Sequence, residues 1–439
     1  MTEAPAGTLG ILAFSRSPGQ PAGEPRLCAE LAGAGARYGL AVRVFAPEGV
    51  AAGPLTQAGP AGGGARLPGW ELADGGWREG RFPPPDILLD RTFPKDAAER
   101  KLAARARSRL APVSLPWSRG LPGKWAVHGW LLRDPEAAAL LPETCRLTGP
   151  EDVLRLGGTA DGAILKPETG AQGRGIVHIR PHPAGGWTMR GRDAANRPFL
   201  RRFPDRGEGL RWLLAFAGGR RYLVQRYLRL LSAGGQPFDV RVLMQKDASG
   251  RWQETGRAVR LGPRGRLTSN LHGGGSALPV LPFLRTQYGA EAGRIMERLT
   301  AAAERIPALL EAGFGRQGEL GLDFGIGQDG RIWLLEANSK PGRAAFRRIG
   351  DRQAAQLASD RPAAYARRLL ELSRAAHPRR SGSARRVRRE TPVRRGAEAF
   401  RRSGRSGRAA RNHPQDSGVP QLARAPAGAP RAVCAVPSL

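Results

Sequence analysis

Residues 318–342 read GELGLDFGIGQDGRIWLLEANSKPG, and their pattern predicts two β-strands joined by a turn at 328–330. Successive side chains of a strand point to opposite faces. Glu336 and Asn338 therefore share one face of the second strand, while Asp323 lies inside the first strand between apolar neighbours. Two carboxylates and an amide oxygen inside an apolar hairpin are costly unless another group compensates them.

The hairpin predicts a magnesium site formed by Asp323, Glu336 and Asn338. Carboxylate and amide oxygens are hard ligands, and Mg²⁺ commonly joins one or two carboxylates to nucleotide phosphates. The alternative is structural: the carboxylates face solvent at the strand edges or pair with Arg331 and Arg343.

A second motif, AILKPETGAQGRGI at 163–176, places Lys166 at a strand end directly before a loop with Gly170, Gly173 and Gly175. Glycines let backbone N–H groups approach phosphate oxygens, and the ammonium neutralises their charge. The spacing matches neither a Walker loop nor a dinucleotide-binding fingerprint. The motif indicates a triphosphate cradle; a glycine-rich hairpin with a solvated lysine is the alternative.

The strand PFDVRVLMQ at 237–245 carries Asp239 and Arg241 on one face. A guanidinium there offers a fork of donors to phosphate oxygens, and Asp239 is expected to orient it. The alternative is an ordinary ion pair within the sheet.

Two further segments are candidate parts of the same site. The apolar run YLVQRYL at 222–228 leads into an expected linker between two lobes, where backbone groups and an apolar wall suit an adenine. Asn270 precedes HGGG at 272–275 and is either a ligand to metal or phosphate or an ordinary turn residue.

The sequence predicts three parts: a small α/β domain at 1–115, a larger body at 116–376 and a tail at 377–439. Apolar runs alternate with a helix-like stretch over 8–45, as in a parallel α/β unit, whereas 51–85 is dominated by Gly, Pro and Ala. The tail has 15 Arg against three carboxylates and almost no large apolar residue, so we expect it to be disordered.

Composition narrows the classes of function. Hydrophobic residues make up 41% of the chain, no apolar run reaches the roughly 20 residues of a membrane helix, and the start lacks a secretory signal pattern. Cys28, Cys145 and Cys434 are far apart and odd in number, which indicates neither a disulfide framework nor a zinc site. These features predict a cytoplasmic protein without membrane association.

The net charge of +32 raises the possibility of a nucleic-acid partner. The basic run of the tail has no interleaved aromatic residues and matches no recognised binding module. The remaining charge is spread over an arginine-rich body, which also suits a high-GC coding sequence. Nucleic acid is therefore not an expected partner.

Taken in order, several of these segments resemble the ATP-grasp superfamily, and most closely its YheC/YheD endospore coat-associated branch: KPETGAQGRGI, YLVQRYL, FDVRVLMQ, ELGLDFGI and LLEANSKPGR. The likeness extends over roughly residues 8–350. It implies an α+β ATP-grasp body with two lobes clasping ATP, preceded by a small α/β domain of the pre-ATP-grasp type. Each motif alone is weak, but their combined order is highly specific.

The resemblance also implies roles for individual residues. It gives Lys124 and Lys166 as paired phosphate-contacting lysines, Gln225, Arg226, Tyr227 and Leu228 as the adenine and ribose contacts, Arg241 as a contact to phosphate or acyl phosphate, and Asp323, Glu336 and Asn338 as magnesium ligands. Arg241 and Lys166 are then the expected catalytic residues, with ATP and Mg²⁺ as cofactors. Many ATP-grasp linkers carry a glutamate that binds ribose, but this chain has Arg226 after Gln225.

Superfamily members usually join a carboxylate to an amine or thiol through an acyl phosphate. The resemblance therefore implies an ATP-dependent ligase whose carboxylate and amine substrates are unidentified. The alternative is a non-catalytic structural protein of the spore coat that retains an ATP-binding fold. The named branch adds spore-coat proteins as expected partners and the spore coat as a second expected location.

Overall fold

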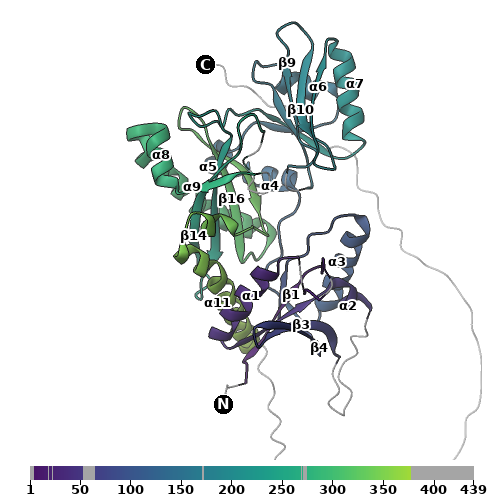
Figure 1. Cartoon of the computed structure of the whole chain (residues 1–439), viewed down its shortest axis with the longest axis vertical. Helices are drawn as coiled ribbons and strands as arrows, with labels where there is room; N and C mark the ends of the chain where they lie inside the picture. The colour runs from purple at the N-terminus through teal and green to yellow at the C-terminus, as the bar shows by residue number, and fades with distance from the viewer. Residues whose placement is uncertain are drawn as a thin grey trace, which may run out of the picture. The chain divides into compact units, whose positions relative to one another are not determined.

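The computed structural model describes residues 4–17, 19–21, 23–52, 65–170, 173–267, 269 and 274–376. These residues all belong to one structural unit and form three β-sheets with flanking helices (Figure 1). The predicted disordered tail at 377–439 and the predicted site residue Asn270 lie outside the described residues.

The first sheet has the strand order β4-β3-β2-β1-β5-β6, and β1 pairs in parallel with both β2 and β5. Its elements are β1 (Gly7–Leu12), α1 (Pro25–Arg37), β2 (Leu40–Phe45), α2 (Pro47–Ala52), β3 (Leu67–Ala73), β4 (Gly76–Phe82), β5 (Ile87–Asp90), α3 (Ala97–Leu110) and β6 (Leu115–Pro116). Leu9 and Ile11 of β1 share a buried cluster with Leu31 of α1. The α/β unit predicted over 8–45 is confirmed.

The hairpin of β3 and β4 was missed by the sequence analysis, which read 51–85 only as a stretch rich in Gly, Pro and Ala. The two strands are antiparallel and meet at Asp74 and Gly75, which both have positive φ, 50° and 77°. An Asp-Gly pair at such positions is the preferred two-residue hairpin turn, because its twist matches that of the strands. This Asp-Gly pair was the signal that could have revealed the hairpin.

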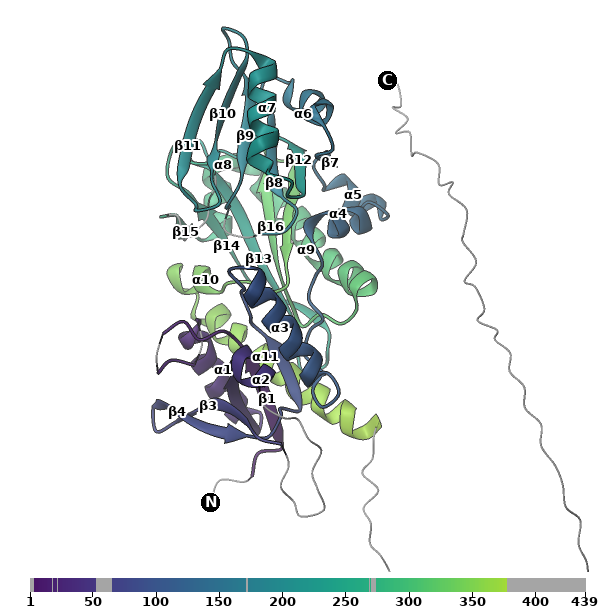
Figure 2. The same ribbon diagram turned by 90° about the vertical axis from the view of Figure 1, so that its right-hand side faces the viewer.

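The second sheet is antiparallel in the order β11-β10-β9-β8-β12-β7. Its elements are β7 (Thr144–Arg146), α6 (Pro150–Gly157), β8 (Ala163–Pro167), β9 (Val177–Pro181), β10 (Trp187–Arg192), β11 (Pro198–Phe203), α7 (Arg206–Ala217) and β12 (Tyr222–Arg226). Figure 2 shows α7 alongside these strands. Val153 of α6 and Leu213 of α7 lie in one buried cluster with Ile179 and Met189, so α6 and α7 cover the same face of the sheet.

The third sheet has the order β15-β14-β13-β16-β17. The remaining elements of the body are α4 (Lys124–Leu131), α5 (Pro135–Ala139), β13 (Phe238–Lys246), β14 (Trp252–Leu261), β15 (Ser276–Leu278), α8 (Val280–Tyr288), a 3₁₀ turn (Gly289–Glu291), α9 (Ala292–Phe314), β16 (Glu319–Ile326), β17 (Ile332–Asn338), α10 (Ala344–Arg348) and α11 (Arg352–Ala376). Helix α9 packs its apolar stripe on one face, where Ile295 and Leu299 meet Leu322. The hairpin predicted at 318–342 is confirmed, with its turn held by the Gly330 N–H donating to Gly327 O at 2.9 Å.

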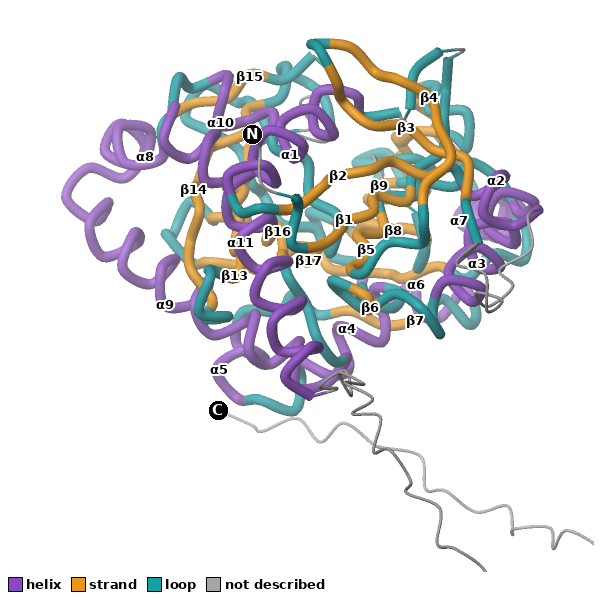
Figure 3. The backbone as a smooth tube through the Cα atoms, turned by 90° about the horizontal axis from the view of Figure 1, so that it is seen from below, coloured by secondary structure: helices purple, strands orange, loops and turns teal. Residues whose placement is uncertain are grey.

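Helix α11 packs against two sheets at once (Figure 3). Its residues Leu369 and Leu370 lie in the buried cluster of β1 and α1, whereas Ala358 packs with Leu243 of β13. The C-terminal helix thus completes the core of the N-terminal sheet, and the predicted domain boundary at residue 115 stays a prediction. No helix of the residues described is both long and apolar enough to cross a bilayer.

Helix α7 offers a direct test of a local stabilising contact. The Asp205 side chain caps it by accepting from the Glu208 N–H at 2.6 Å. Asp205→Ala should lower the free energy of unfolding by about 1 kcal/mol, because one helix-end N–H loses its acceptor. Urea unfolding measures this. Asp205→Asn keeps the cap and is the control; an Ala variant as stable as the parent would contradict the capping role.

Candidate functional site

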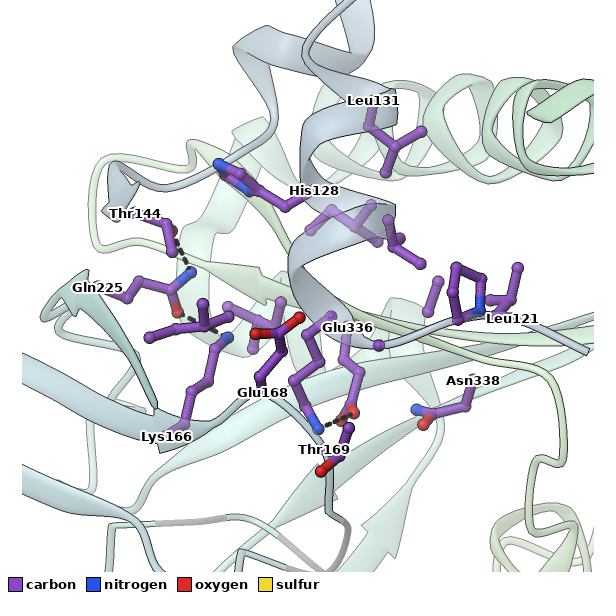
Figure 4. A pocket seen from close by; sticks show the side chains of 18 of the residues that line it. Leu121, His128, Leu131, Thr144, Lys166, Glu168, Thr169, Gln225, Glu336 and Asn338 are labelled. Carbon is purple, nitrogen blue, oxygen red and sulfur yellow. Dashed lines mark hydrogen bonds and ion pairs between the residues drawn. The ribbon is translucent and has the colours of Figure 1, made fainter. Parts of the chain in front are cut away.

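A pocket of about 340 Å³ lies where the second and third sheets and α4 meet (Figure 4). Its wall combines apolar side chains with a small set of polar ones. Predicted site residues that line it are Lys124, Lys166, Gly170, Gln225, Glu336 and Asn338. These six come from α4, β8, the following loop, β12 and β17, so the fold brings together segments that are up to about 200 residues apart.

Lys166 enters the pocket from β8 and is held by a short chain of hydrogen bonds. Its Nζ donates to Gln225 Oε1 at 3.0 Å, and Gln225 Nε2 donates to Thr144 Oγ1 at 2.8 Å. Burial lowers the pKa of Lys166 to about 8; Glu336 acts against this shift and Lys124 adds to it. A lysine with a lowered pKa and a neutral amide partner is ready to accept an anionic ligand.

Lys124 reaches the pocket from the N-terminus of α4. Its Nζ donates to Gly170 O at 2.7 Å and lies 3.2 Å from Glu336 Oε1. Lys124 therefore connects the glycine loop with Glu336, and Figure 4 shows Glu336 in the same pocket as Lys166. Two cations that line one pocket favour an anionic ligand such as a phosphate chain.

The glycines of the predicted cradle have the backbone that only glycine adopts readily. Gly170, Gly173 and Gly175 have φ values of 142°, 74° and 71°. At Gly175 a Cβ would also lie 2.8 Å from Tyr222 Oη. The loop therefore requires glycine, while its contact with phosphate stays a prediction.

The predicted linker residues 225–228 differ in whether they line the pocket. Gln225 lines the pocket, but Arg226, Tyr227 and Leu228 do not. Tyr227 instead stacks on His178, with ring centroids 4.0 Å apart. The adenine and ribose contacts predicted for 226–228 stay predictions.

Two buried ion pairs join β13 to its neighbours. Arg241 Nη2 lies 2.9 Å from Asp323 Oδ2, and Arg260 Nε lies 2.6 Å from Asp239 Oδ1. Arg260 Nη2 also lies 3.0 Å from Asp323 Oδ2, so the four charges form one network, and each residue is less than 9% exposed.

This network corrects the expectation that Asp239 orients Arg241. The antiparallel register places Asp239 opposite Arg260 and Arg241 opposite Asp323. Directly opposite residues on neighbouring strands lie closer than residues two apart on one strand, so the ion pairs form across strands. The structural alternative for Asp323 is also corrected in detail, since its partners are Arg241 and Arg260 rather than Arg331 or Arg343.

The three predicted magnesium ligands differ in how available their oxygens are. Glu336 is opposite Asp323 in the register of β16 and β17, and Asn338 Nδ2 lies 3.5 Å from Asp323 Oδ2. Asp323 accepts from two guanidiniums, which fill most of its four lone-pair positions. Within the described ranges, Glu336 Oε2 and Asn338 Oδ1 accept no hydrogen bond.

Glu336 and Asn338 therefore fit a hard cation at the pocket, whereas Asp323 as placed here belongs to the arginine network. No cluster of three or more His, Cys, Asp or Glu side chains suited to a metal occurs among the described residues. A metal site at this hairpin would be formed by the carboxylate of Glu336 and the amide of Asn338. The metal role of Asp323 stays a prediction.

Several residues that line the pocket were missed by the sequence analysis, among them Thr144 and Glu168. Thr144 anchors Gln225, and Glu168 lines the pocket with its Oε1 bound to Arg146 at 3.1 Å. Glu168 Oε2 is buried and has no partner within the described part of the chain. Glu168 directly follows the end of β8, two residues after Lys166, and this closeness to the predicted lysine was the signal for it.

The paired antiparallel sheets around this pocket, with a parallel α/β sheet before them, are an ATP-grasp fold. The sequence model of the family described as "YheC/D like ATP-grasp" matches residues 116–369. The chain belongs to this family.

Two curated relatives come from Bacillus subtilis (strain 168). The endospore coat-associated protein YheC is 28% identical over 355 residues, covering 80% of this chain and 93% of YheC. The endospore coat-associated protein YheD is 29% identical over 276 residues, covering 62% of this chain and 60% of YheD.

Solved structures with similar folds share little sequence. D-cycloserine synthetase DcsG is 12% identical with a TM-score of 0.47, covering 83% of this chain and 99% of DcsG. D-alanyl-alanine synthetase A from Vibrio cholerae O1 biovar eltor str. N16961 is 14% identical with a TM-score of 0.44, covering 83% of this chain and 99% of that protein.

Proposed function

We propose that this chain binds ATP and Mg²⁺ in the pocket and uses them to join a carboxylate to an amine or thiol. The observation that supports this most directly is the convergence of Lys124 and Lys166 with the open oxygens of Glu336 and Asn338 in one pocket. Cations suit the phosphates, and the carboxylate and amide suit the metal. Membership in an ATP-grasp family supports the same assignment.

In the proposed reaction, a substrate carboxylate oxygen attacks the γ-phosphorus and ADP leaves, giving an acyl phosphate. An amine or thiol then attacks the acyl carbon and releases phosphate. Lys166 and Lys124 would stabilise the negative charge of the phosphates. Glu336 and Asn338 would hold Mg²⁺, which supplies further charge stabilisation when bound.

Arg241 is the second proposed catalytic residue, as a contact to the transferred phosphate. It lies on β13 opposite Asp323 of β16, and Asp323 in turn lies opposite Glu336 of β17. One guanidinium can serve both the carboxylate and a phosphate because it carries five donors.

A non-catalytic protein of the endospore coat is the second candidate function. The pairing of Asp323 with Arg241 and Arg260 favours it, because a carboxylate held by two arginines is a poor metal ligand. The names of the curated relatives support an association with the coat for either candidate, and the cytoplasmic location stays a prediction. Release of ADP from ATP in the presence of Mg²⁺ and pools of amino acids distinguishes the two, because only the ligase turns over.

Glu336→Ala tests the metal assignment. It should weaken ATP binding by roughly tenfold in the presence of Mg²⁺ and leave binding without Mg²⁺ nearly unchanged, since one metal ligand is lost. Calorimetry with and without the metal measures both affinities. Glu304→Ala, on the exposed side of α9, is the matched control. Unchanged affinity of Glu336→Ala for ATP in Mg²⁺ would remove Glu336 from the metal site.

A further inference from the structure

The segment 174–229, which contains most of the second sheet and α7, is rich in arginine. Residues 174–229 contain 13 Arg and no Lys, against only Asp193, Asp205 and Glu208. The ATP pocket uses none of these arginines. The proposed function therefore leaves this concentration of charge unexplained.

The strand register shows which way these side chains point. Arg180 and Arg202 both lie opposite Thr188 of β10, and Arg190 lies opposite His178. The alternate residues Ile179 and Met189 are buried under α7, so the arginines point to the opposite face. We call Arg180, Arg190, Arg192 and Arg202 the arginine face. Arg180 and Arg202 are exposed, and the other two are half-buried.

No carboxylate of the described residues pairs with any arginine of this face. Arg190 Nε donates to His178 Nδ1 at 3.3 Å, and Arg192 Nη1 donates to Asn196 Oδ1 at 3.2 Å. In the third sheet, by contrast, Arg241 and Arg260 are neutralised by carboxylates. Like charges on neighbouring strands repel one another, and a bound anionic partner would relieve this repulsion.

The arginine face lies beside the pocket, on the same side of the second sheet as Gln225. Gln225, Ile164, His178 and Arg190 lie in one row across β12, β8, β9 and β10. Three strand spacings separate Gln225 from Arg190, which is about 14 Å. The Tyr227 ring covers His178 between them, so the face is a separate surface beside the pocket rather than a part of it.

We propose that the arginine face binds an acidic polypeptide segment. Guanidinium groups bind carboxylates through paired hydrogen bonds. The neighbouring strand β11 is at the sheet edge, so its outer backbone groups are available to an extended peptide. Nucleic acid is less suited because the aromatic rings of this sheet are already packed: Trp187 and Phe203 are buried, and Tyr227 stacks on His178.

The test uses the full chain and a fluorescein-labelled deca-glutamate peptide in an anisotropy titration. The triple variant Arg180→Ser, Arg190→Ser, Arg202→Ser should weaken peptide binding about tenfold, because three charge pairs of about 0.5 kcal/mol each are lost. The control removes three arginines from other elements, Arg100→Ser, Arg105→Ser and Arg285→Ser, and should change binding less than about twofold. The arginine-rich tail is the same in both variants, so its contribution cancels.

Further measurements keep this proposal separate from the proposed function. ATP affinity should be equal in the parent and in the triple variant, so loss of peptide binding alone supports the arginine face. Equal weakening of peptide binding by the two triple variants would overturn the proposal. It would also be overturned if the triple variant of the arginine face lost more affinity for a dT10 oligonucleotide than for the peptide. If the triple variant fails to fold, Arg202→Glu reverses one exposed charge and should also weaken peptide binding; unchanged binding there counts against the proposal.

Discussion

Replacing Lys166 by Met should weaken ATP binding by about one to two decades and leave adenosine binding unchanged. Met keeps the length of the side chain and removes its charge. A charge-assisted hydrogen bond to a phosphate contributes roughly 1.5 to 3 kcal/mol, which corresponds to this loss of affinity. Adenosine has no phosphates, so it lacks the group that Lys166 would contact. Calorimetry with both ligands measures the difference.

The pH dependence of the same binding gives a second measurement. Burial lowers the pKa of Lys166 to about 8, so the free protein loses this charge as the pH rises through 8. Phosphates favour the charged lysine, so ATP affinity should fall above about pH 8 in the parent. The Met variant should lack this contribution to the pH dependence.

Lys101→Met, on the exposed side of α3, is the matched control and should bind ATP as the parent does. Equal weakening of ATP and adenosine by Lys166→Met would mean that the substitution disturbs the whole sheet. The phosphate role of Lys166 would then have to be withdrawn.

The parts of the site that the sequence predicted well are local. The hairpin at 318–342 follows from a turn and two apolar strands within 25 residues, and the alternation of its side chains places Glu336 and Asn338 in the pocket. Lys166 and the glycines of the loop after it are likewise close together in the sequence, so one short segment was enough to predict them as a group. Lys124 lies 42 residues before Lys166, and only the family resemblance connected the two.

The parts that were mispredicted depend on the register of distant strands. Every residue of β13 is buried, so neither face can be recognised as the outer one from its pattern. The partner of Asp239 is 21 residues away and that of Arg241 is 82 residues away. The packing of helix α11 is even harder to predict from sequence. Its role in the core of the N-terminal sheet depends on contacts with β1, which is far from it in the sequence.

Asp323→Ala should destabilise the protein by about 3 to 5 kcal/mol, whereas Glu336→Ala should cost less than about 1 kcal/mol. Asp323 is buried and neutralises Arg241 and Arg260, so its removal leaves uncompensated charge inside the third sheet. The side chain of Glu336 is 31% exposed, and among the described residues its ion-pair partner is Lys124 alone. Urea unfolding without nucleotide measures both changes.

A double variant separates the loss of charge balance from the loss of packing. In Asp323→Leu with Arg241→Met, one buried charge of each sign is replaced by an apolar side chain, and Arg260 keeps its partner Asp239. Replacing both members of a buried ion pair is often neutral, whereas removing one is costly, so the double variant should recover much of the stability lost in Asp323→Leu alone.

If Asp323→Ala unfolds at the same urea concentration as the parent, the arginine network does not stabilise the sheet. The Asp323 carboxylate would then be free for the metal role that the sequence predicts.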